Sequence, residues 1–127
     1  MKDNVFQYEK DVRILAFTTE KGHVSGELMK NIKFRLPREI EKLHTWIEEG
    51  QEIGQILITN HVVFVVLKRH YNSRLKREEF EAILKKIAPR LEPLKLKTTT
   101  ESLEEYKDLV LDYVPHLKYY STSKWEI

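Results

Sequence analysis

The amino-acid sequence predicts an α/β protein built as a three-layer α/β/α sandwich with a mixed central sheet. Short apolar runs rich in β-branched and aromatic residues alternate along the chain with segments whose apolar residues recur at helical spacing. Residues 62–67 are apolar at every position, which is typical of a strand that helices cover on both faces. The 127 residues predict a single domain, residues 1–127, with a core of its own.

The first half of the chain predicts two strands and then two helices. Residues 5–8 and 12–17 are rich in β-branched and aromatic residues and are expected to be strands. A loop punctuated by glycine follows, and two stretches of helical periodicity, at residues 28–36 and 40–47, come after it. Gly50 lies just past the second of these, as the C-terminus of a helix favours.

A hairpin and a third helix are predicted next. Residues 55–59 and 62–67 are both strand-like and are separated by only two residues, which favours a hairpin or near-hairpin. Residues 80–91 carry the clearest helical period in the chain. We expect Pro89 to stop this helix, because proline lacks the backbone N–H that a helix interior needs.

The chain then predicts a strand, a helix and a final strand. Residues 94–98 alternate between apolar and polar side chains, as a half-buried strand does. Residues 101–114 predict a helix, with Ser102 as its cap and Glu105 completing a capping box. The last strand is expected at residues 117–121, and the full order is β-β-α-α-β-β-α-β-α-β.

Composition excludes several kinds of chemistry. The chain has no cysteine, so neither disulfides nor thiolate catalysis is available. Its five histidines are scattered without metal-ligand spacing, and we expect neither a metal ion nor another cofactor. No apolar run is long enough to span a bilayer, and the first residues lead into no apolar segment of a secretion signal. We therefore expect a cytoplasmic protein with no membrane partner.

The overall charge is not that of a dedicated nucleic-acid-binding domain. The chain has 22 basic and 20 acidic residues and a net charge of +2, whereas such domains are usually strongly basic. Charged residues make up 33% of the chain, and lysine and glutamate are abundant, a composition that leans toward proteins of thermophiles.

The loop that precedes the first helix is the clearest candidate ligand site. Gly22 and Gly26 punctuate it, and the helix behind it starts with backbone N–H groups that can face an anion such as phosphate. Two interpretations stay open, because the glycines either shape a phosphate-binding loop or provide a plain turn before a helix. His23, at the tip of the loop, either touches the anion or is exposed without a role.

A second candidate site is a basic segment that follows the apolar strand. It comes at the carboxyl end of a strand, where open α/β sheets bind ligands, and this favours a role in gripping phosphates. The other interpretation is a solvated loop whose cations balance the neighbouring glutamates. The basic side chains of this segment are Lys68, Arg69, His70, Arg74, Lys76 and Arg77.

The glycine loop and the order of elements together resemble the macro domain, the ADP-ribose-binding family. Many members carry an Asn-Cys-x-Gly-x-Met-Gly-x-Gly loop and then a helix that ends near Lys-x-Arg-Phe-Pro. Laid without gaps, the first Asn of the motif falls on Thr19 and its first Gly on Gly22. The Met-Gly-x-Gly and Arg-Phe-Pro runs fall on Val24, Ser25, Gly26, Glu27, Arg35, Leu36 and Pro37.

A second motif resembles one branch of that family. Members close to the DNA-ADP-ribosyl glycohydrolases carry Phe-Pro-Thr-Lys-Arg-His-Trp at the end of the central strand. This chain has Val-Val-Leu-Lys-Arg-His-Tyr there, at residues 65–71. In that branch the lysine of the motif is implicated in breaking the ADP-ribose linkage. The resemblance implies that Lys68 is the corresponding catalytic residue.

The ligand loops depart from the family pattern. Thr19 replaces the Asn expected at the distal ribose, and Ser25 and Glu27 stand where the family brings its backbone close to pyrophosphate. Residues 98–102 contain no glycine, although the family has its second glycine-rich phosphate loop there. The Asp that contacts adenine would fall near Asn4. These departures indicate a degenerate domain, leaning toward binding without efficient catalysis.

The sequence thus predicts a macro-like domain that binds ADP-ribose, a related nucleotide or an ADP-ribosylated target. The implied ligand-binding residues are Asn4, Thr19, Gly22, His23, Val24, Ser25, Gly26, Arg69 and His70. One alternative is a residual ADP-ribosyl hydrolase that uses Lys68. The other is a nucleic-acid-binding module, whose affinity falls steeply with salt. That module would use Lys68, Arg69, Arg74, Lys76 and Arg77.

Overall fold

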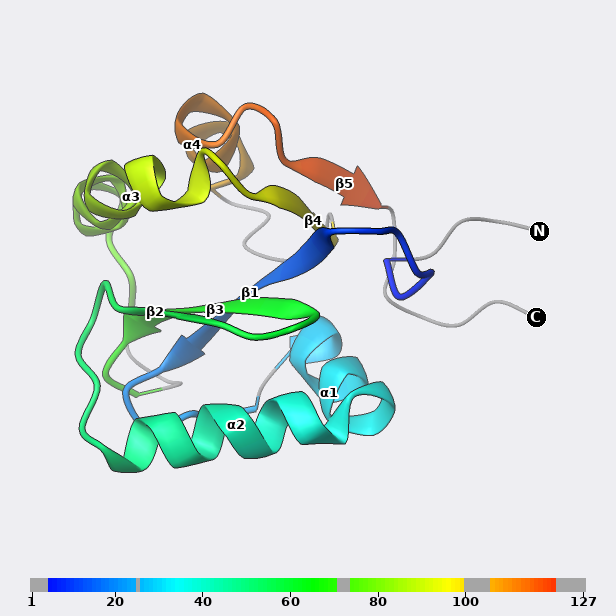
Figure 1. The fold of residues 1–127 in the computed structure, drawn as a ribbon. Coiled ribbons are helices and arrows are strands. Elements are labelled where there is room, and N and C mark those ends of the chain that lie inside the picture. Colours follow the sequence, from blue (N-terminus) through cyan, green and yellow to red (C-terminus); the bar gives the residue numbers. More distant parts are fainter. Residues whose placement is uncertain (1–4, 25, 71–73, 100–105, 121–127) are drawn as a thin grey trace.

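One mixed sheet of five strands lies between two layers of helices (Figure 1). The computed structural model describes residues 5–24, 26–70, 74–99 and 106–120. The strands follow the order β2-β3-β1-β4-β5 across the sheet. The predicted three-layer α/β/α sandwich is confirmed.

The described helices and strands alternate along most of the chain. The strands are β1 (Val12–Thr19), β2 (Ile56–Ile58), β3 (Val62–Lys68), β4 (Lys95–Thr99) and β5 (Lys118–Tyr120). The helices are α1 (Gly26–Arg35), α2 (Pro37–Glu48), α3 (Arg77–Leu91) and α4 (Lys107–Tyr113).

The centre of the sheet is β1, which pairs in parallel with β3 on one side and with β4 on the other. Strand β5 runs parallel to β4, whereas β2 is an antiparallel edge strand next to β3. Because four strands run the same way, their carboxyl ends point to one side of the sheet. There β1 ends at Thr19, β3 at Lys68 and β4 at Thr99. We call these three strand ends, with the loop that follows β1, the carboxyl edge.

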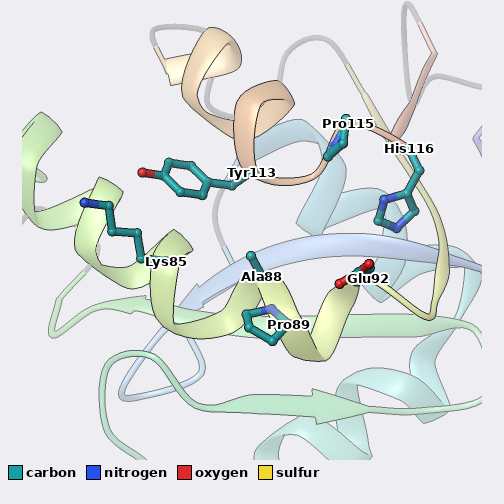
Figure 2. A pocket seen from close by; sticks show the side chains of 7 residues that line it. All are labelled: Lys85, Ala88, Pro89, Glu92, Tyr113, Pro115 and His116. Atoms are coloured by element: carbon teal, nitrogen blue, oxygen red, sulfur yellow. The ribbon is translucent and has the colours of Figure 1, made fainter.

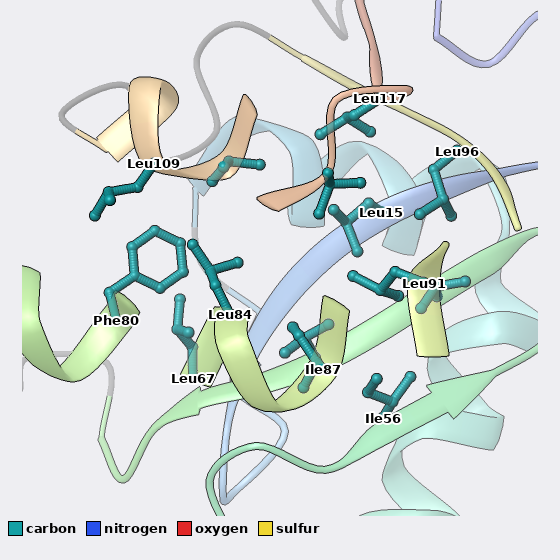
Figure 3. Packing of buried hydrophobic residues seen from close by; sticks show 14 residues of the cluster. Leu15, Ile56, Leu67, Phe80, Leu84, Ile87, Leu91, Leu96, Leu109 and Leu117 are labelled. Carbon is teal, nitrogen blue, oxygen red and sulfur yellow. The ribbon is translucent and has the colours of Figure 1, made fainter. Parts of the chain in front are cut away.

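Two apolar cores, one on each face of the sheet, hold the layers together. Helices α3 and α4 cover one face, where Phe80 and Leu84 pack with side chains of the strands (Figure 3). Helices α1 and α2 cover the other face, with Met29 and Leu43 in its core. Strand β3 contributes to both cores, and residues 62–67 are all buried. The prediction of a strand covered on both faces is therefore confirmed.

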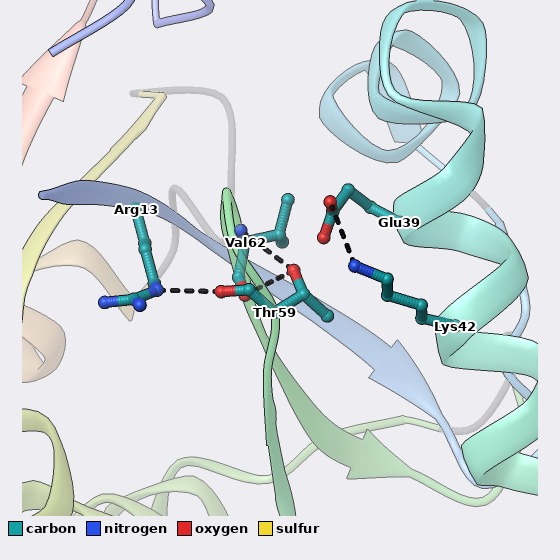
Figure 4. A network of polar contacts seen from close by, with 5 residues as sticks. All are labelled: Arg13, Glu39, Lys42, Thr59 and Val62. Carbon is teal, nitrogen blue, oxygen red and sulfur yellow. Dashed lines mark hydrogen bonds and ion pairs between the residues drawn. The ribbon is translucent and has the colours of Figure 1, made fainter. Parts of the chain in front are cut away.

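The connection between β2 and β3 is the predicted tight hairpin. The backbone N–H of Thr59 donates to the carbonyl of Val62 (2.8 Å). The Thr59 hydroxyl donates to the same carbonyl (3.0 Å) and accepts from the Val62 N–H (3.1 Å), as Figure 4 shows. Nε of Arg13 on β1 donates to the carbonyl of Thr59 (2.7 Å). The turn is thus tied to the central strand. Separately, Lys42 and Glu39 form an ion pair along α2 (3.9 Å).

Two local predictions are wrong. Residues 5–8 form turns and a bend instead of a strand, and Val5 is fully buried in the core of α1 and α2. Pro89 does not stop α3, which continues to Leu91. Ile87 and Leu91 are buried on either side of Pro89, so their packing keeps the last turn helical despite the missing N–H.

The C-terminal elements match the predictions where the structure describes them. The strands expected at residues 94–98 and 117–121 are present as β4 and β5. Helix α4 lies within the predicted helix at residues 101–114. Ser102 and Glu105, the predicted capping box, lie outside the described residues.

The segment before β1 is tied to β4 and β5 by side chains instead of by strand pairing. Nζ of Lys97 donates a hydrogen bond to the carbonyl of Gln7 (2.6 Å). The Tyr120 hydroxyl donates to Oε1 of Glu9, and Nζ of Lys118 is 3.6 Å from the same carboxylate oxygen. These contacts, with the burial of Val5, hold the segment against the sheet.

We expect the change Tyr120→Phe to raise the pKa of Glu9 and to destabilise the fold. The hydrogen bond from Tyr120 and, after it, the ammonium groups of Lys97 and Lys118 hold the pKa of Glu9 below its ordinary value. A depressed carboxyl pKa stabilises the fold above the unfolded pKa, and this contribution is lost as the pH falls through the folded pKa. Loss of the hydroxyl should cost about 1 kcal/mol at neutral pH and less in acid.

An NMR titration of the Glu9 carboxyl, with urea unfolding at neutral and acidic pH, measures both effects. Tyr119→Phe is the control, because Tyr119 packs against the opposite core, and burial there raises its own pKa to about 12. An unchanged pKa of Glu9 in Tyr120→Phe would contradict the prediction.

Candidate functional site

The topology of the sheet indicates that a ligand would bind at the carboxyl edge. The chain leaves β1 toward α1 and α2 on one face of the sheet (Figure 1). It leaves β4, the neighbour of β1, toward α4 on the opposite face. Open α/β sheets bind ligands beyond the carboxyl ends of adjacent strands whose connections diverge in this way.

The loop from β1 to α1 is folded around the side chain of Thr19. The Thr19 hydroxyl accepts hydrogen bonds from the N–H groups of Lys21 (3.3 Å) and His23 (3.2 Å). The Thr19 carbonyl accepts one from the N–H of Gly22 (2.9 Å), and the Thr18 hydroxyl donates to the carbonyl of His23 (3.2 Å). Thr19 is buried, so its hydroxyl serves the loop backbone, and its contact with a ligand stays a prediction.

Gly22 anchors this loop on helix α2. Its carbonyl oxygen is hydrogen-bonded to Nε2 of His44 (3.0 Å). Its φ is +69°, and a Cβ at this position would lie 3.0 Å from Cδ2 of His44 and 3.1 Å from Cγ1 of Ile47. Both the backbone conformation and the close contact therefore require glycine. Sequence analysis missed His44, because no local pattern reports a contact with a loop 22 positions away.

The start of helix α1 is open at Gly26. Apart from its chain neighbours and the backbone of its own helix, nothing in the described part of the chain lies within 4 Å of the place that a Cβ of Gly26 would take. The N–H groups of a first helical turn have no partners within the helix, so they can face a ligand here. Glu27 is exposed, and its Oε1 accepts a hydrogen bond from Nδ2 of Asn31 (3.2 Å), one turn further along. The only carboxylate of the first turn is thus held toward Asn31.

Lys68 lies directly beside Thr19 in the sheet. The two residues are partners in the pairing of β3 with β1, and the Lys68 carbonyl accepts a hydrogen bond from the N–H of Glu20 (2.8 Å). Lys68 is half-buried, and Arg69 and His70 after it are exposed. The structure therefore brings Thr19, where the glycine loop begins, and Lys68, 49 positions further along the sequence, to one edge of the sheet.

Two threonines with different surroundings end β4. The Thr98 hydroxyl donates a hydrogen bond to the carbonyl of Leu15 on β1 (2.9 Å). Thr99 is completely buried, and its hydroxyl has no hydrogen-bond partner among the described residues. Buried polar groups without a partner are rare in proteins, so a polar ligand atom is a reasonable partner for this one. Sequence analysis missed Thr99, because residues 98–100 are all threonine and nothing distinguishes one from another.

Solved structures share this arrangement of strands and helices. No protein-family model matches the chain, and no curated protein sequence matches it. The macrodomain of Thermus aquaticus DarG gives a TM-score of 0.70 over 94% of this chain and 95% of that chain, at 14% sequence identity. The macrodomain of Mycobacterium tuberculosis DarG gives 0.69 over 94% and 92%, at 11% identity.

This chain has the macrodomain fold. A longer protein, Thermosipho africanus DarTG in complex with ADP-ribose, is also similar, with a TM-score of 0.66 at 15% identity. That match covers 98% of this chain and 41% of the DarTG chain. Because these sequence identities are low, the similarity establishes the macrodomain fold alone. The ligand of this chain has to be argued from the chain's own residues.

The remaining predicted ligand residues lie around the same part of the macrodomain fold or outside the described residues. His23 is exposed at the loop, and Val24 is half-buried against the core of α1 and α2. Asn4 and Ser25 lie outside the described residues. Their contacts with a ligand stay predictions.

The side chains of the predicted basic segment lie in different surroundings. Arg77 begins α3 and contacts Asp108 on α4 through two pairs of atoms, at 2.5 and 3.4 Å. The hydrogen bond from Arg77 lowers the pKa of Asp108. Arg74 and Lys76 are exposed. Arg77 is therefore engaged within the protein, and nucleic-acid binding stays a prediction of the sequence.

A separate hollow of about 320 Å³ lies between α3 and the turn that follows α4 (Figure 2). Nε2 of His116 in its wall is within hydrogen-bond distance of the carbonyls of Leu91 (3.1 Å) and Leu94 (2.8 Å). The residues of the wall are Lys85, Ala88, Pro89, Glu92, Tyr113, Pro115 and His116. They come from the ends of helices that lead into the amino ends of β4 and β5, so the hollow is not part of the carboxyl edge.

The described ranges contain neither a candidate metal cluster nor a helix that could span a membrane. No three His, Cys, Asp or Glu side chains in residues 5–24, 26–70, 74–99 and 106–120 are grouped so that they could hold a metal ion. Among the helices described, none is both long and apolar enough to cross a bilayer.

We expect Gly22→Ala to destabilise the protein more than Gly50→Ala does. Both glycines have positive φ, +69° and +87°, which costs an L-residue about 1–2 kcal/mol. Only at Gly22 would the new methyl group press on His44 and Ile47, and such overpacking adds about 1–3 kcal/mol. Urea unfolding of the two variants measures the difference. Equal losses would show that the loop does not depend on its packing against α2.

Proposed function

We propose that this chain binds ADP-ribose or a related nucleotide, free or attached to a modified target, at the carboxyl edge of its macrodomain fold. The observation that carries the proposal is the open start of α1 at Gly26, joined by a short loop to the end of β1. The structure of T. africanus DarTG, which has the same fold in part of its chain, is a complex with ADP-ribose and supports the proposal.

A diphosphate suits the start of α1 for electrostatic reasons. The aligned peptide dipoles of a helix place about half a positive charge at its N-terminus, where N–H groups can donate to phosphate oxygens. Because Gly26 has no side chain and the space beside it is open, a phosphate group can approach the backbone closely. The Glu27 carboxylate, bonded to Asn31, is held away from that approach.

Polar groups of the strand ends would complete the site. The Thr99 hydroxyl can donate to or accept from a ribose hydroxyl or a phosphate oxygen, which would satisfy a group that has no partner in the described protein. Lys68 ends the strand on the other side of β1, and its cation would favour a bound anion. Arg69 and His70 extend the same rim toward solvent.

We further propose that binding proceeds without efficient catalysis. The Thr19 hydroxyl accepts two hydrogen bonds from the loop, and threonine is shorter than the Asn expected at this position. No glycine follows β4 within residues 98–102 to form a second phosphate loop. A substrate would therefore be held by fewer groups near the distal ribose. Precise positioning of the reacting bond supplies much of the rate of an enzyme, so a loosely held substrate reacts slowly.

Hydrolysis of an ADP-ribosyl linkage is the second candidate function. The observation that favours it is the pairing of Lys68 with Thr19 at the carboxyl edge, which puts an amine-bearing residue next to the loop. Its amine would act as a nucleophile or a base in its neutral form. If the chain has this activity, Lys68→Ala should abolish release of ADP-ribose from modified DNA or protein, measured by chromatography. Lys95→Ala, an exposed lysine at the opposite end of β4 from the carboxyl edge, is the control and should retain it.

We expect Thr99→Val to weaken binding of ADP-ribose without destabilising the protein. The change removes a hydroxyl that has no described protein partner, so folding loses nothing, whereas a hydrogen bond to the ligand is lost. The expected loss of affinity is about three- to ten-fold. Thr98→Val should behave in the opposite way, because it removes the bond to Leu15, costing about 1 kcal/mol of stability, and leaves affinity unchanged.

Calorimetric titration with ADP-ribose and urea unfolding of the wild type and both variants measure these effects. Absence of heat with the wild type at millimolar ADP-ribose would overturn the proposed function. Saturable binding with equal affinity in wild type and Thr99→Val would remove Thr99 from the site and leave the start of α1 as its centre.

A further inference from the structure

A second pocket lies at the opposite end of the sheet from the carboxyl edge. It has a volume of about 220 Å³ and lies between the segment before β1 and the amino ends of the strands. Val12 begins β1 and His61 directly precedes β3, and both line the pocket. Val12 and Thr19 are the two ends of the same strand, so roughly 23 Å separates this pocket from the carboxyl edge. Any ligand here is independent of the proposed ADP-ribose site.

The wall of this pocket is mostly apolar, with one buried cation. The apolar side chains are those of Val5, Phe6, Val12, Ile14 and Leu36, and Gln7, Tyr8, Glu9 and His61 complete the wall. Lys97, on β4, also lines the pocket and is only 3% exposed. A lysine buried to this degree is unusual unless it is paired with an opposite charge.

Lys97 lacks such a pair in the described part of the chain. Its Nζ donates one hydrogen bond, to the carbonyl of Gln7 (2.6 Å), and lies 5.9 Å from the centre of the Tyr120 ring. No described carboxylate comes within 4 Å of its ammonium group. The charge of Glu9, which also lines the pocket, acts on Lys97, but the Glu9 carboxylate is already bound by the Tyr120 hydroxyl and by Lys118.

The charge around Lys97 therefore favours an anion. One carboxylate, Glu9, faces two ammonium groups, those of Lys97 and Lys118, so the cluster carries an excess positive charge. Burial lowers the pKa of Lys97, and the charge of Glu9 only partly opposes this. An ammonium group has three N–H donors, and an acceptor brought into the pocket would satisfy donors that the described residues leave unused.

We propose that this pocket binds a small organic acid, with its carboxylate paired to Lys97 and its hydrocarbon part against the apolar wall. The volume is below the range of about 300–1,000 Å³ typical of pockets for drug-sized ligands, so the acid has only a few carbon atoms. Inorganic phosphate or sulfate could pair with the charge of Lys97 but has no hydrocarbon part to pack against the apolar wall. The apolar wall therefore favours an organic acid over these ions.

The first test compares isovalerate with isovaleramide on the wild-type full chain. The two molecules have nearly the same shape, and only the acid carries a charge. We expect isovalerate to shift backbone amide NMR signals of residues 5–14 and of Lys97 saturably, with at least about ten-fold higher affinity than isovaleramide. Equal affinities, or no saturable shift with isovalerate, would overturn the proposal. Because this comparison needs no variant, it decides the matter even if a change at Lys97 prevents folding.

The second test changes the cation itself. Lys97→Met keeps the aliphatic part of the side chain and removes the ammonium group, so isovalerate should lose about ten-fold or more in affinity. Lys95→Met, an exposed position on the same strand, is the matched control and should bind as the wild type does. Undiminished binding in Lys97→Met, or an equal loss in Lys95→Met, would overturn the assignment of Lys97. Isovalerate shifts confined to residues near Gly26 would also overturn it, by locating the acid at the carboxyl edge.

Discussion

The parallel pairing of β1 with β3, at the centre of the sheet and buried on both faces, is the constraint on which the rest of the structure depends. Burying a Val, Leu, Ile or Phe side chain contributes about 1.5–3 kcal/mol, so strands that are apolar on both faces need helices on both sides. Parallel strands also need long crossover connections, which the helices provide. As a result, Thr19, Lys68 and Thr99 come to the same edge, although they belong to distant parts of the sequence.

Some polar groups of the carboxyl edge are bonded within the protein, and others are available to a ligand. The hydroxyls of Thr19 and Thr98 are used within the protein, where they shape the loop after β1 and join β4 to β1. Gly22 fixes the same loop on α2 through His44. These contacts leave open space beside Gly26 and leave the Thr99 hydroxyl without a partner in the described residues. A loop held by hydrogen bonds beside an unused polar group is the preorganised arrangement that ligand binding favours.

Most elements could be predicted because their periodicity is local. The buried strand at residues 62–67 and the helical stripe at residues 80–91 are patterns that each segment carries by itself. The failures have tertiary causes. Residues 5–8 have strand-like composition, but Val5 enters a core and side chains of β4 and β5 hold the rest. Pro89 should end a helix, but buried neighbours keep the last turn in place.

The sequence by itself predicted the order of strands and helices from residue 12 onward, excluded cysteine chemistry, and showed a glycine loop and a strand-end lysine, Lys68, at a spacing that resembles the macrodomain pattern. Only the tertiary structure decided which polar groups have partners. The Thr98 hydroxyl bonds a residue 83 positions away, and the Lys97 ammonium bonds one 90 positions away. Burial and hydrogen bonding depend on contacts between segments that are distant in the sequence. A local sequence pattern cannot predict such contacts.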